Sequence, residues 1–286
     1  MAIYNLGSIN IDYFYKAPHL LQAGETLAAS DFSQGLGGKG ANQSVACARS
    51  GAQIFHIGHL HEKDKNWLSF LQGSGVDISH IKLGDVPTGH AIIIIDETNG
   101  ENQILLLAGA NGAIEKSALE NSLAQATSSD WALCQNETNL GVEFLQMAHA
   151  KGLSICYSAA PFVKEVVLSV LEFVDLLVVN EIEAAEIEKA LAAPPAQWGV
   201  AHLIITKGGA GAEYYGKDGQ FHQPAHKVKA VDTTGAGDTY LGFLLGRLSM
   251  GDEMRQAMAI ASKAAAIQVT RYGTAEAIPL MSELEI

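Results

Sequence analysis

The segment between Val231 and Thr239 combines residue types that could handle a phosphoryl group. It reads Val-Asp-Thr-Thr-Gly-Ala-Gly-Asp-Thr and opens a helix expected over 235–248. Glycine and alanine let a ligand approach the backbone closely, and the free N–H groups at a helix start favour an anion. We therefore expect Gly235, Ala236 and Gly237 to form an anion hole for a phosphoryl group.

Asp238 lies in the first turn of that expected helix. An acidic residue there can simply complement the helix dipole. A carboxylate beside an anion hole is, however, a poor neighbour for phosphate, which favours a chemical role. We expect Asp238 to be a general base that takes a proton from a substrate hydroxyl during phosphoryl transfer.

A second glycine-rich segment, residues 35–40, reads Gly-Leu-Gly-Gly-Lys-Gly. It matches the dinucleotide-binding pattern G-x-G-x-x-G, but no buried strand precedes it and no acidic residue stands in the following strand, where Phe55 and His56 lie. It also fails the phosphate-loop pattern, because Ser33 replaces the first glycine and Gly40 replaces the magnesium-binding Ser or Thr.

The glycines of this segment are thus expected to bring the backbone close to a small polar ligand. Lys39 and Asn42 would then donate hydrogen bonds to hydroxyls or to the transferring phosphate.

Alternating strands and helices must position these segments. Strands are expected at 3–6, 54–57, 131–135, 154–157, 176–180 and 202–206, and helices at 41–50, 138–151, 235–248 and 252–269. The run Leu176–Val179 is apolar at successive positions, which is typical of a parallel strand covered on both faces. The pattern predicts an α/β fold with a doubly wound, mostly parallel sheet flanked by helices.

Two β-rich segments, about 12–34 and 90–107, do not fit this alternation. The second contains Thr98-Asn99-Gly100 between two apolar runs, which is a hairpin signal. We expect both segments to form a small β lid that projects from a single domain spanning residues 1–286.

Polar residues follow several of the expected strands. In an open α/β sheet, ligands bind beyond the carboxyl ends of the strands. Each such residue alone is ordinary at a strand end, but together they predict a site for a molecule with many hydroxyls. They are Asn10, Asp12, Glu137, Asn180, Glu183 and Thr206.

Composition narrows the function classes. Lys and Arg number 18 against 31 Asp and Glu, giving a net charge of −13, which disfavours nucleic-acid and membrane-surface binding. The apolar run Ala91–Ile95 is far shorter than the ~20 residues of a membrane span. With no signal-like N-terminus, we expect a cytoplasmic protein. Cys47, Cys134 and Cys156 have apolar flanks and are expected to be buried thiols.

The two glycine-rich segments resemble the signatures of the phosphofructokinase-B family of carbohydrate kinases: G-G-K-G-x-N at 37–42 and D-T-x-G-A-G-D at 232–238. The likeness continues from Gly7-Ser8-Ile9-Asn10-x-Asp12 through 109–111 and 180–183 to 269–273, and thus covers nearly the whole chain. Within the family, it is similar to the ribokinase-like branch.

This resemblance implies an ATP-dependent kinase that phosphorylates a primary hydroxyl of a pentose such as ribose, with Asp238 as base beside the anion hole. It implies ATP and sugar as ligands, and a homodimer formed through the lid. The sugar would be held by Asn10, Asp12, Gly38, Lys39, Asn42 and Glu137. The nucleotide site would include Thr206, Gly208, Gly211 and Ser262.

The resemblance also implies metal ions. Asn180 and Glu183 would organise Mg²⁺ and its waters. Members of the family often use a monovalent cation such as K⁺, and the matching positions are Asp232 and Thr234 with the loop 269–274. The sequence leaves open whether K⁺ is required.

The chain departs from the family at two places, which leaves the sugar open. Ser158-Ala159-Ala160-Pro161 stands where N-P-A-P is usual, and histidines crowd the segment after Gly58. His56, His59 and His61 complete no known metal pattern and are expected to be structural or to shape the substrate site. Three alternatives stay open: another carbohydrate or nucleoside kinase, a non-catalytic sugar sensor, and a nicotinamide-dependent oxidoreductase resting on G-x-G-x-x-G alone.

Overall fold

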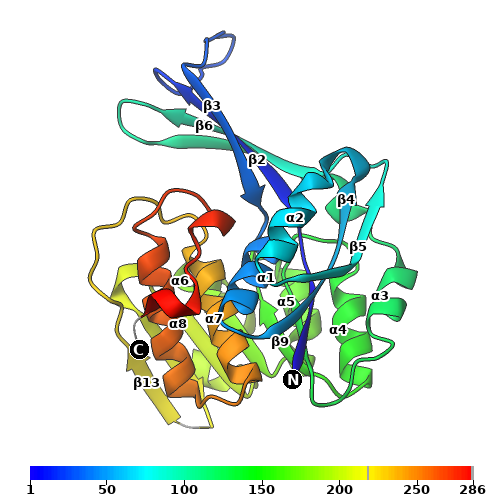
Figure 1. Ribbon diagram of the computed structural model, residues 1–286. Helices are drawn as coiled ribbons and strands as arrows, with labels where there is room; N and C mark the ends of the chain where they lie inside the picture. The colour runs from blue at the N-terminus through cyan, green and yellow to red at the C-terminus, as the bar shows by residue number, and fades with distance from the viewer. Residues whose placement is uncertain (218, 285–286) are drawn as a thin grey trace.

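The computed structural model describes residues 1–217 and 219–284. Within these residues a nine-stranded sheet has the order β13-β12-β11-β10-β9-β8-β1-β4-β5 (Figure 1). Its strands are β1 (Ala2–Leu6), β4 (Gln53–His61), β5 (Asp77–Gly84), β8 (Trp131–Cys134), β9 (Ser154–Ser158), β10 (Leu176–Asn180), β11 (His202–Thr206), β12 (Ala212–Gly216) and β13 (Gly219–Gln223). From β11 to β5 all neighbours are parallel, and β12 and β13 are antiparallel.

Helices cover both faces of this sheet. One face packs against α1 (Lys39–Arg49), α2 (Asn66–Gly73), α7 (Ala236–Ser249) and α8 (Met254–Gln268). The other packs against α3 (Lys116–Ser122), α4 (Gly141–Ala150), α5 (Lys164–Val170) and α6 (Glu181–Leu191). Strand β10 sends Leu176 and Val178 into the first core and Leu177 and Val179 into the second. The predicted doubly wound, mostly parallel α/β fold is therefore confirmed.

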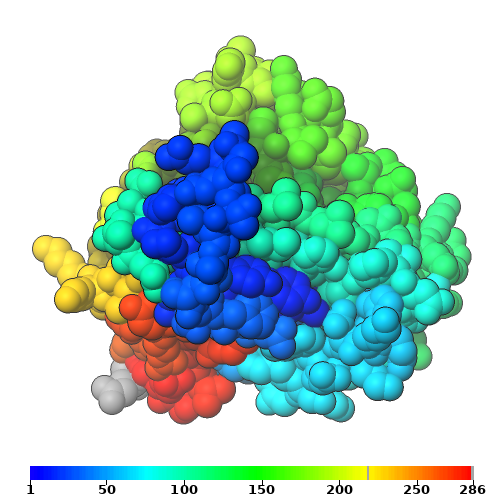
Figure 2. Space-filling model, turned by 90° about the horizontal axis from the view of Figure 1, so that it is seen from above, coloured from blue at the N-terminus to red at the C-terminus, as the bar shows by residue number. Residues whose placement is uncertain are grey.

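A second, four-stranded sheet projects from the carboxyl edge of the large one (Figure 1). We call it the small sheet. It has the order β3-β2-β6-β7, with β2 at Asn10–Ala17, β3 at Asp31–Gly37, β6 at Gly89–Asp96 and β7 at Asn102–Leu107. Seen from above, it lies over the middle of that face (Figure 2). The two β-rich segments that broke the alternation thus pair with each other, through the parallel neighbours β2 and β6.

Some elements differ from the sequence expectation. Helix α4 begins at Gly141 rather than 138, because Leu140 has a left-handed backbone (φ 60°) that the helix cannot include. No element was expected at α2, α3, α5, α6 or β5. In β5 a register shift places both Ile78 and Ile81 against the core, so the strand lacks the period-two pattern that would identify it.

The three cysteines are buried free thiols, as expected. Burial raises the pKa of the Cys134 thiol to about 12, which leaves it unreactive at neutral pH. Among the described residues, no helix has the length and apolar character that crossing a membrane requires.

Candidate active site

Several of the predicted site residues lie where the strand order of the sheet reverses. Strand β1 lies between β4 on one side and β8 on the other. The later strands are therefore added to the sheet in two directions from β1, first β4 and β5 and then β8 onward. In doubly wound sheets the crevice beyond the carboxyl ends at such a reversal is where ligands bind. The segment after β1, the start of α1 and the residue Glu137 after β8 all meet there.

Strand β1 and helix α1 approach each other at glycines. A Cβ on Gly40 would lie 2.3 Å from the Cα of Gly7, so neither position has room for a side chain. The N–H groups of Lys39 and Gly40, at the helix start, donate to Glu137 Oε2 (3.0 Å) and Ser8 Oγ (3.2 Å). Ser8 Oγ also donates to Glu137 (2.5 Å), which fixes this carboxylate at the positive end of α1.

Asp238 faces α1 from the first turn of α7. It is 9% exposed, and each carboxylate oxygen accepts one hydrogen bond: Oδ2 from Asn42 Nδ2 (3.0 Å) and Oδ1 from Gln43 Nε2 (2.9 Å). The side chain therefore points into the region between α7 and α1 rather than into solvent.

The turn before Asp238 has the geometry of an anion hole. Gly235 precedes α7 with φ 79°, a left-handed conformation that favours glycine, and no side chain caps the helix. Within the described residues, the N–H groups of Gly237 and Asp238 have no acceptor. Ala236 N–H reaches only Thr233 O, at 3.3 Å. Two backbone donors are thus available beside the Asp238 carboxylate.

Lys39 supplies a positive charge among the carboxylates of the site. The charge of Asp238 raises the Lys39 pKa most strongly, Glu137 and Glu183 raise it further, and burial opposes them. Lys39 therefore stays protonated at neutral pH. Its charge thus acts on carboxylates from both sides of the site, Glu137 after β8 and Glu183 in α6.

Asp12 lies on β2 of the small sheet, not in a loop after β1. Its carboxylate occupies the space above Gly37, where a Cβ would lie 2.0 Å from Oδ2. Burial, then the charges of Glu137 and Glu276, raise its pKa to about 7. No described residue donates a hydrogen bond to this carboxylate. Its neighbour on β2, Asn10, accepts a hydrogen bond from Asn111 Nδ2 (2.7 Å).

Asn180 and Glu183 form the start of α6. Asn180 Oδ1 accepts from the Glu183 N–H (2.9 Å), and Glu183 Oε2 accepts from the Asn180 N–H (2.8 Å), a reciprocal capping box. Burial raises the pKa of Glu183, with help from the charge of Asp238, against the Asn180 hydrogen bond and Lys39. Thr206 pairs with Asn180 across β10 and β11, so both strand ends border the same region.

The Asp232 carboxylate, in the loop before α7, accepts hydrogen bonds from its own loop and from the segment after α8. It accepts from the N–H groups of Thr234 (2.9 Å) and Gly273 (3.2 Å). Gln268 Nε2 donates to the carbonyl oxygens of Thr234 (2.6 Å) and Gly273 (3.3 Å). The two loops expected to hold a monovalent cation are therefore in direct contact, and one carbonyl oxygen of each accepts from the same Gln268 amide group.

Two of the remaining predicted residues, Gly211 and Ser262, contact the segment 223–225 at the end of β13. A Cβ on Gly211 would lie 2.1 Å from Gln223 O, and Ser262 Oγ on α8 donates to Pro224 O (3.2 Å). Gly208 is exposed in the turn after β11. No described contact joins these residues to Asp238 directly.

Sequence reasoning missed three residues that contact the site. Gln43 follows Asn42 in the glycine-rich motif and could have been noticed there. Ser8 was only part of a quoted pattern. Glu276 had no local signal: its Oε1 accepts from the Leu36 N–H (3.2 Å), a contact between residues 240 positions apart.

Two of the three histidines noted in the sequence contact backbone oxygens. His56 and His59 are buried within β4 and not in a loop, and their Nε2 and Nδ1 atoms contact Gly7 O (3.1 Å) and Ala113 O (3.2 Å). In the described part of the chain, no group of three or more His, Cys, Asp or Glu residues is arranged to hold a metal ion.

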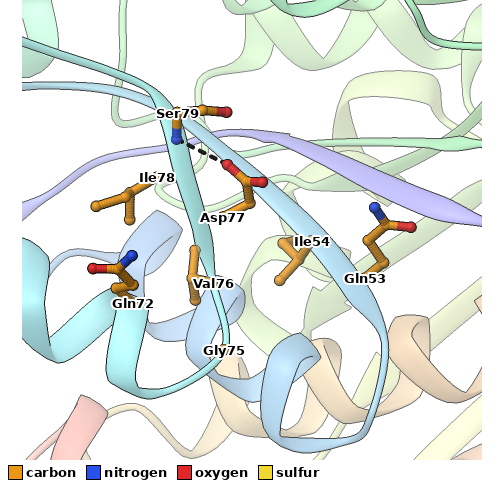
Figure 3. A pocket seen from close by; sticks show the side chains of 8 residues that line it. All are labelled: Gln53, Ile54, Gln72, Gly75, Val76, Asp77, Ile78 and Ser79. Carbon is orange, nitrogen blue, oxygen red and sulfur yellow. Dashed lines mark hydrogen bonds between the residues drawn. The ribbon is translucent and has the colours of Figure 1, made fainter.

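A hollow of about 480 Å³ lies at the amino ends of β4 and β5, at the end of the sheet opposite the site (Figure 3). It is lined by residues that begin β4 and β5, including Gln53 and Asp77. Its place at the amino ends of the strands separates it from the site built around Asp238.

Comparison with known proteins decides the family. The model of the pfkB family of carbohydrate kinases matches residues 3–281. This chain belongs to the pfkB family. It is an ATP-dependent carbohydrate kinase, a phosphotransferase with an alcohol group as acceptor, as the sequence predicted.

Individual relatives agree with this assignment. Ribokinase from Schizosaccharomyces pombe is 34% identical, over 98% of this chain and 95% of that protein. The crystal structure of Thermotoga maritima ribokinase superimposes with a TM-score of 0.89 at 29% identity, over 100% of this chain and 98% of that one. Ribokinase from Cryptococcus neoformans, solved in complex with ADP, gives 0.88 at 27% identity over 99% and 98%.

Proposed function

We propose that this pfkB kinase transfers the γ-phosphoryl group of ATP to a primary hydroxyl of a pentose, with ribose as the first candidate. The similar proteins named ribokinase support the sugar class. The observation that carries the chemistry is Asp238, a buried carboxylate beside two backbone N–H groups without a described acceptor, whose charge acts on Lys39.

The sugar would lie beneath the small sheet, between β2 and α1. Asp12 is buried and accepts no hydrogen bond from the described residues, so sugar hydroxyls are the donors that suit it. Asn42 Oδ1 is likewise buried without a partner and suits a hydroxyl donor. Asn10, Gly38, Lys39 and Glu137 surround the same space and complete the proposed sugar site.

Phosphoryl transfer needs a base, an anion hole and a cation. Asp238 would take the proton of the sugar hydroxyl, whose oxygen then bonds to the γ-phosphorus. The bond from that phosphorus to the bridging oxygen of ADP breaks at the same time. The N–H groups of Gly237 and Asp238 would stabilise the charge on the transferring group, and Lys39 would neutralise part of it. Gly208, Gly211, Thr206 and Ser262 would line the nucleotide site.

The residues present fit the expected metal ions. Mg²⁺ in kinases keeps several waters and uses one or two carboxylates with the phosphates, so a site without a protein metal cluster suits it. Glu183, with one oxygen outside the capping box, would hold such waters beside Asn180. Asp232 and the carbonyl oxygens of Thr234 and Gly273, which accept from Gln268 Nε2 in this structure, would hold K⁺ through their remaining lone pairs. Bound Mg²⁺ would supply charge neutralisation on the phosphates.

A homodimer through the small sheet is the proposed assembly. Cross-strand register places Tyr13, Tyr15, Phe32, Ile92, Ile94 and Leu105 on one face, opposite the face that carries Asp12. Phe32 and Leu105 are 51% and 68% exposed, and the edge strand β7 is exposed along its whole length. Exposed apolar faces and edge strands of this kind are usually covered by another protein surface. A second copy of this chain would supply that surface.

A substrate panel tests the function. Release of ADP would be followed with ribose, deoxyribose, hexoses and nucleosides, each with and without K⁺. The proposal predicts the highest kcat/KM for a pentose. A nucleoside as the preferred substrate would assign another branch of the family. Binding of a sugar with no ADP release from any of them would indicate a sensor and contradict the proposal.

A further inference from the structure

We infer that Gln43 is a positioning residue for Asp238. We also infer that two buried amide side chains, Gln135 and Asn5, fix the orientation of the Gln43 amide so that its NH₂ group donates to Asp238. This inference rests on the proposed role of Asp238 as base. Nothing in the sequence motifs assigned a function to Gln43 or Gln135.

The carboxylate of Asp238 is held at both oxygens by neighbouring residues of one helix. Gln43 Nε2 donates to Oδ1 at 2.9 Å, and Asn42 Nδ2 donates to Oδ2 at 3.0 Å. One donor alone would let the carboxylate rotate about its Cβ–Cγ bond, whereas two donors on different oxygens fix its plane. Gln43 is 1% exposed, so no water replaces it in this role.

The amide of Gln43 could in principle face either way, because its oxygen and nitrogen are similar in size. Gln135 removes this freedom: its Nε2 donates to Gln43 Oε1 at 2.7 Å. A reversed Gln43 would set two NH₂ groups against each other and turn its carbonyl oxygen toward the Asp238 carboxylate. Both contacts would be repulsive in a site of low dielectric constant.

Gln135 is oriented in turn by Asn5. Gln135 Nε2 donates to Asn5 Oδ1 (2.9 Å), and Asn5 Nδ2 donates to Gly40 O (2.9 Å) and Ser44 Oγ (2.8 Å). These contacts link β1, the end of β8 and α1, the three elements that meet at the strand-order reversal. Asn5 and Gln135 are 0% and 1% exposed, so a wrong orientation would leave buried donors without acceptors.

The arrangement predicts a loss in turnover with little loss in sugar binding. Gln43→Met keeps the length of the side chain but removes the donor, and should lower kcat about 10- to 100-fold, part of the ~10²–10⁴-fold that a general base contributes. The sugar KM should change less than about threefold, since Gln43 does not border the sugar site. Gln135→Met should lower kcat in the same direction, by a smaller factor.

A double-mutant cycle with Asp238→Asn separates positioning from a general structural role. Single-turnover rates with radiolabelled ATP would be measured for Gln43→Met, Asp238→Asn and the double variant. Ser50→Ala is the control, because Ser50 is buried just after the end of α1 and, among the described residues, its hydroxyl bonds only to Cys47 O (2.7 Å). We expect Gln43→Met to slow turnover in the wild-type background and to add nothing in the Asp238→Asn background, and Ser50→Ala to leave the rate unchanged.

Two results would overturn the inference. One is an equal further loss from Gln43→Met in both backgrounds, which would mean a structural effect, and the other is an unchanged kcat. If Gln43→Met does not fold, the same cycle with Gln135→Met decides between these outcomes. Full activity of Asp238→Asn would instead refute the proposed base itself, and the two failures are therefore distinguishable.

Discussion

Among the residues of the site, Asp12 has the carboxylate whose negative charge is least balanced by hydrogen-bond donors or nearby cations. Its carboxylate is buried beside Glu137 and Glu276, and it accepts no hydrogen bond from the described residues. A folded protein selected for stability alone would not keep such a group, so its presence supports a binding role. The cost should be visible in the pH dependence of stability.

Asp12→Asn should stabilise the free protein at high pH. The pKa of about 7 lies above the ordinary 3.8, so the folded state binds this proton more tightly than the unfolded chain. The stabilising contribution of Asp12 is complete below about pH 4 and is lost as the pH rises through 7. The free energy of unfolding of the variant should therefore exceed that of the wild type at pH 8 by about 1–3 kcal/mol, and the difference should shrink toward pH 4.

Urea unfolding between pH 4 and 8 measures this difference, and sugar affinity should fall in the same variant. Asp96→Asn is the matched control on the small sheet. Hydrogen bonds from Thr98 lower the pKa of Asp96, so its replacement should reduce stability at pH 8. Stabilisation of both variants, or of neither, would contradict the assignment of Asp12.

At the scale of elements, the site depends on the contact between α1 and α7. Asn42 and Gln43 on α1 reach Asp238 on α7 only because Gly242 lets the helices approach. A Cβ at Gly242 would lie 2.3 Å from Ala46 Cβ and 2.7 Å from Gln43 O. There is no flexible side chain that could move aside, so the helices themselves must separate.

Gly242→Ala should therefore destabilise the protein by about 1–3 kcal/mol and lower kcat, although residue 242 touches no substrate. Gly73→Ala, at the end of α2, is the control because its Cβ would meet open space. That variant should be neutral or slightly more stable, since alanine favours helices. Thermal unfolding and steady-state rates test both, and equal stability of the two variants would refute the packing argument.

The predicted elements show what local sequence can and cannot reveal. The strands at 176–180 and 202–206 were placed correctly from apolar runs and their flanking residues. The start of α4 and the strand β5 were not, because a left-handed residue and a register shift leave no periodic signal. Both failures come from backbone geometry that tertiary packing selects.

The same distinction holds for the site. Asp238, Lys39 and the glycines lie within short motifs whose chemistry is local, so the sequence alone names them as candidates. The hydrogen bond from Gln135 to Gln43 spans 92 positions and the one from Leu36 to Glu276 spans 240. No spacing rule predicts such pairs, because only the folded sheet brings them together.

For the whole molecule, the exposed face of the small sheet predicts self-association. Leu105→Lys places a charge on the exposed edge strand of that face and should convert a dimer into a monomer. Leu105→Ile, which keeps the apolar surface, is the control and should leave the dimer intact. Sedimentation velocity measures the mass of both variants. A wild-type monomer at micromolar concentration would contradict the proposed assembly.

The account as a whole depends on Asp238 acting as the base of phosphoryl transfer. Asp238→Asn keeps the size of the side chain but removes its charge and its ability to take a proton, and its NH₂ group replaces an oxygen that accepts from Asn42 or Gln43. The most direct test compares its single-turnover rate of ADP formation with its sugar affinity measured by calorimetry. We predict a rate about 10²–10⁴-fold lower, with sugar affinity changed less than about threefold. A rate equal to that of the wild type would contradict the account.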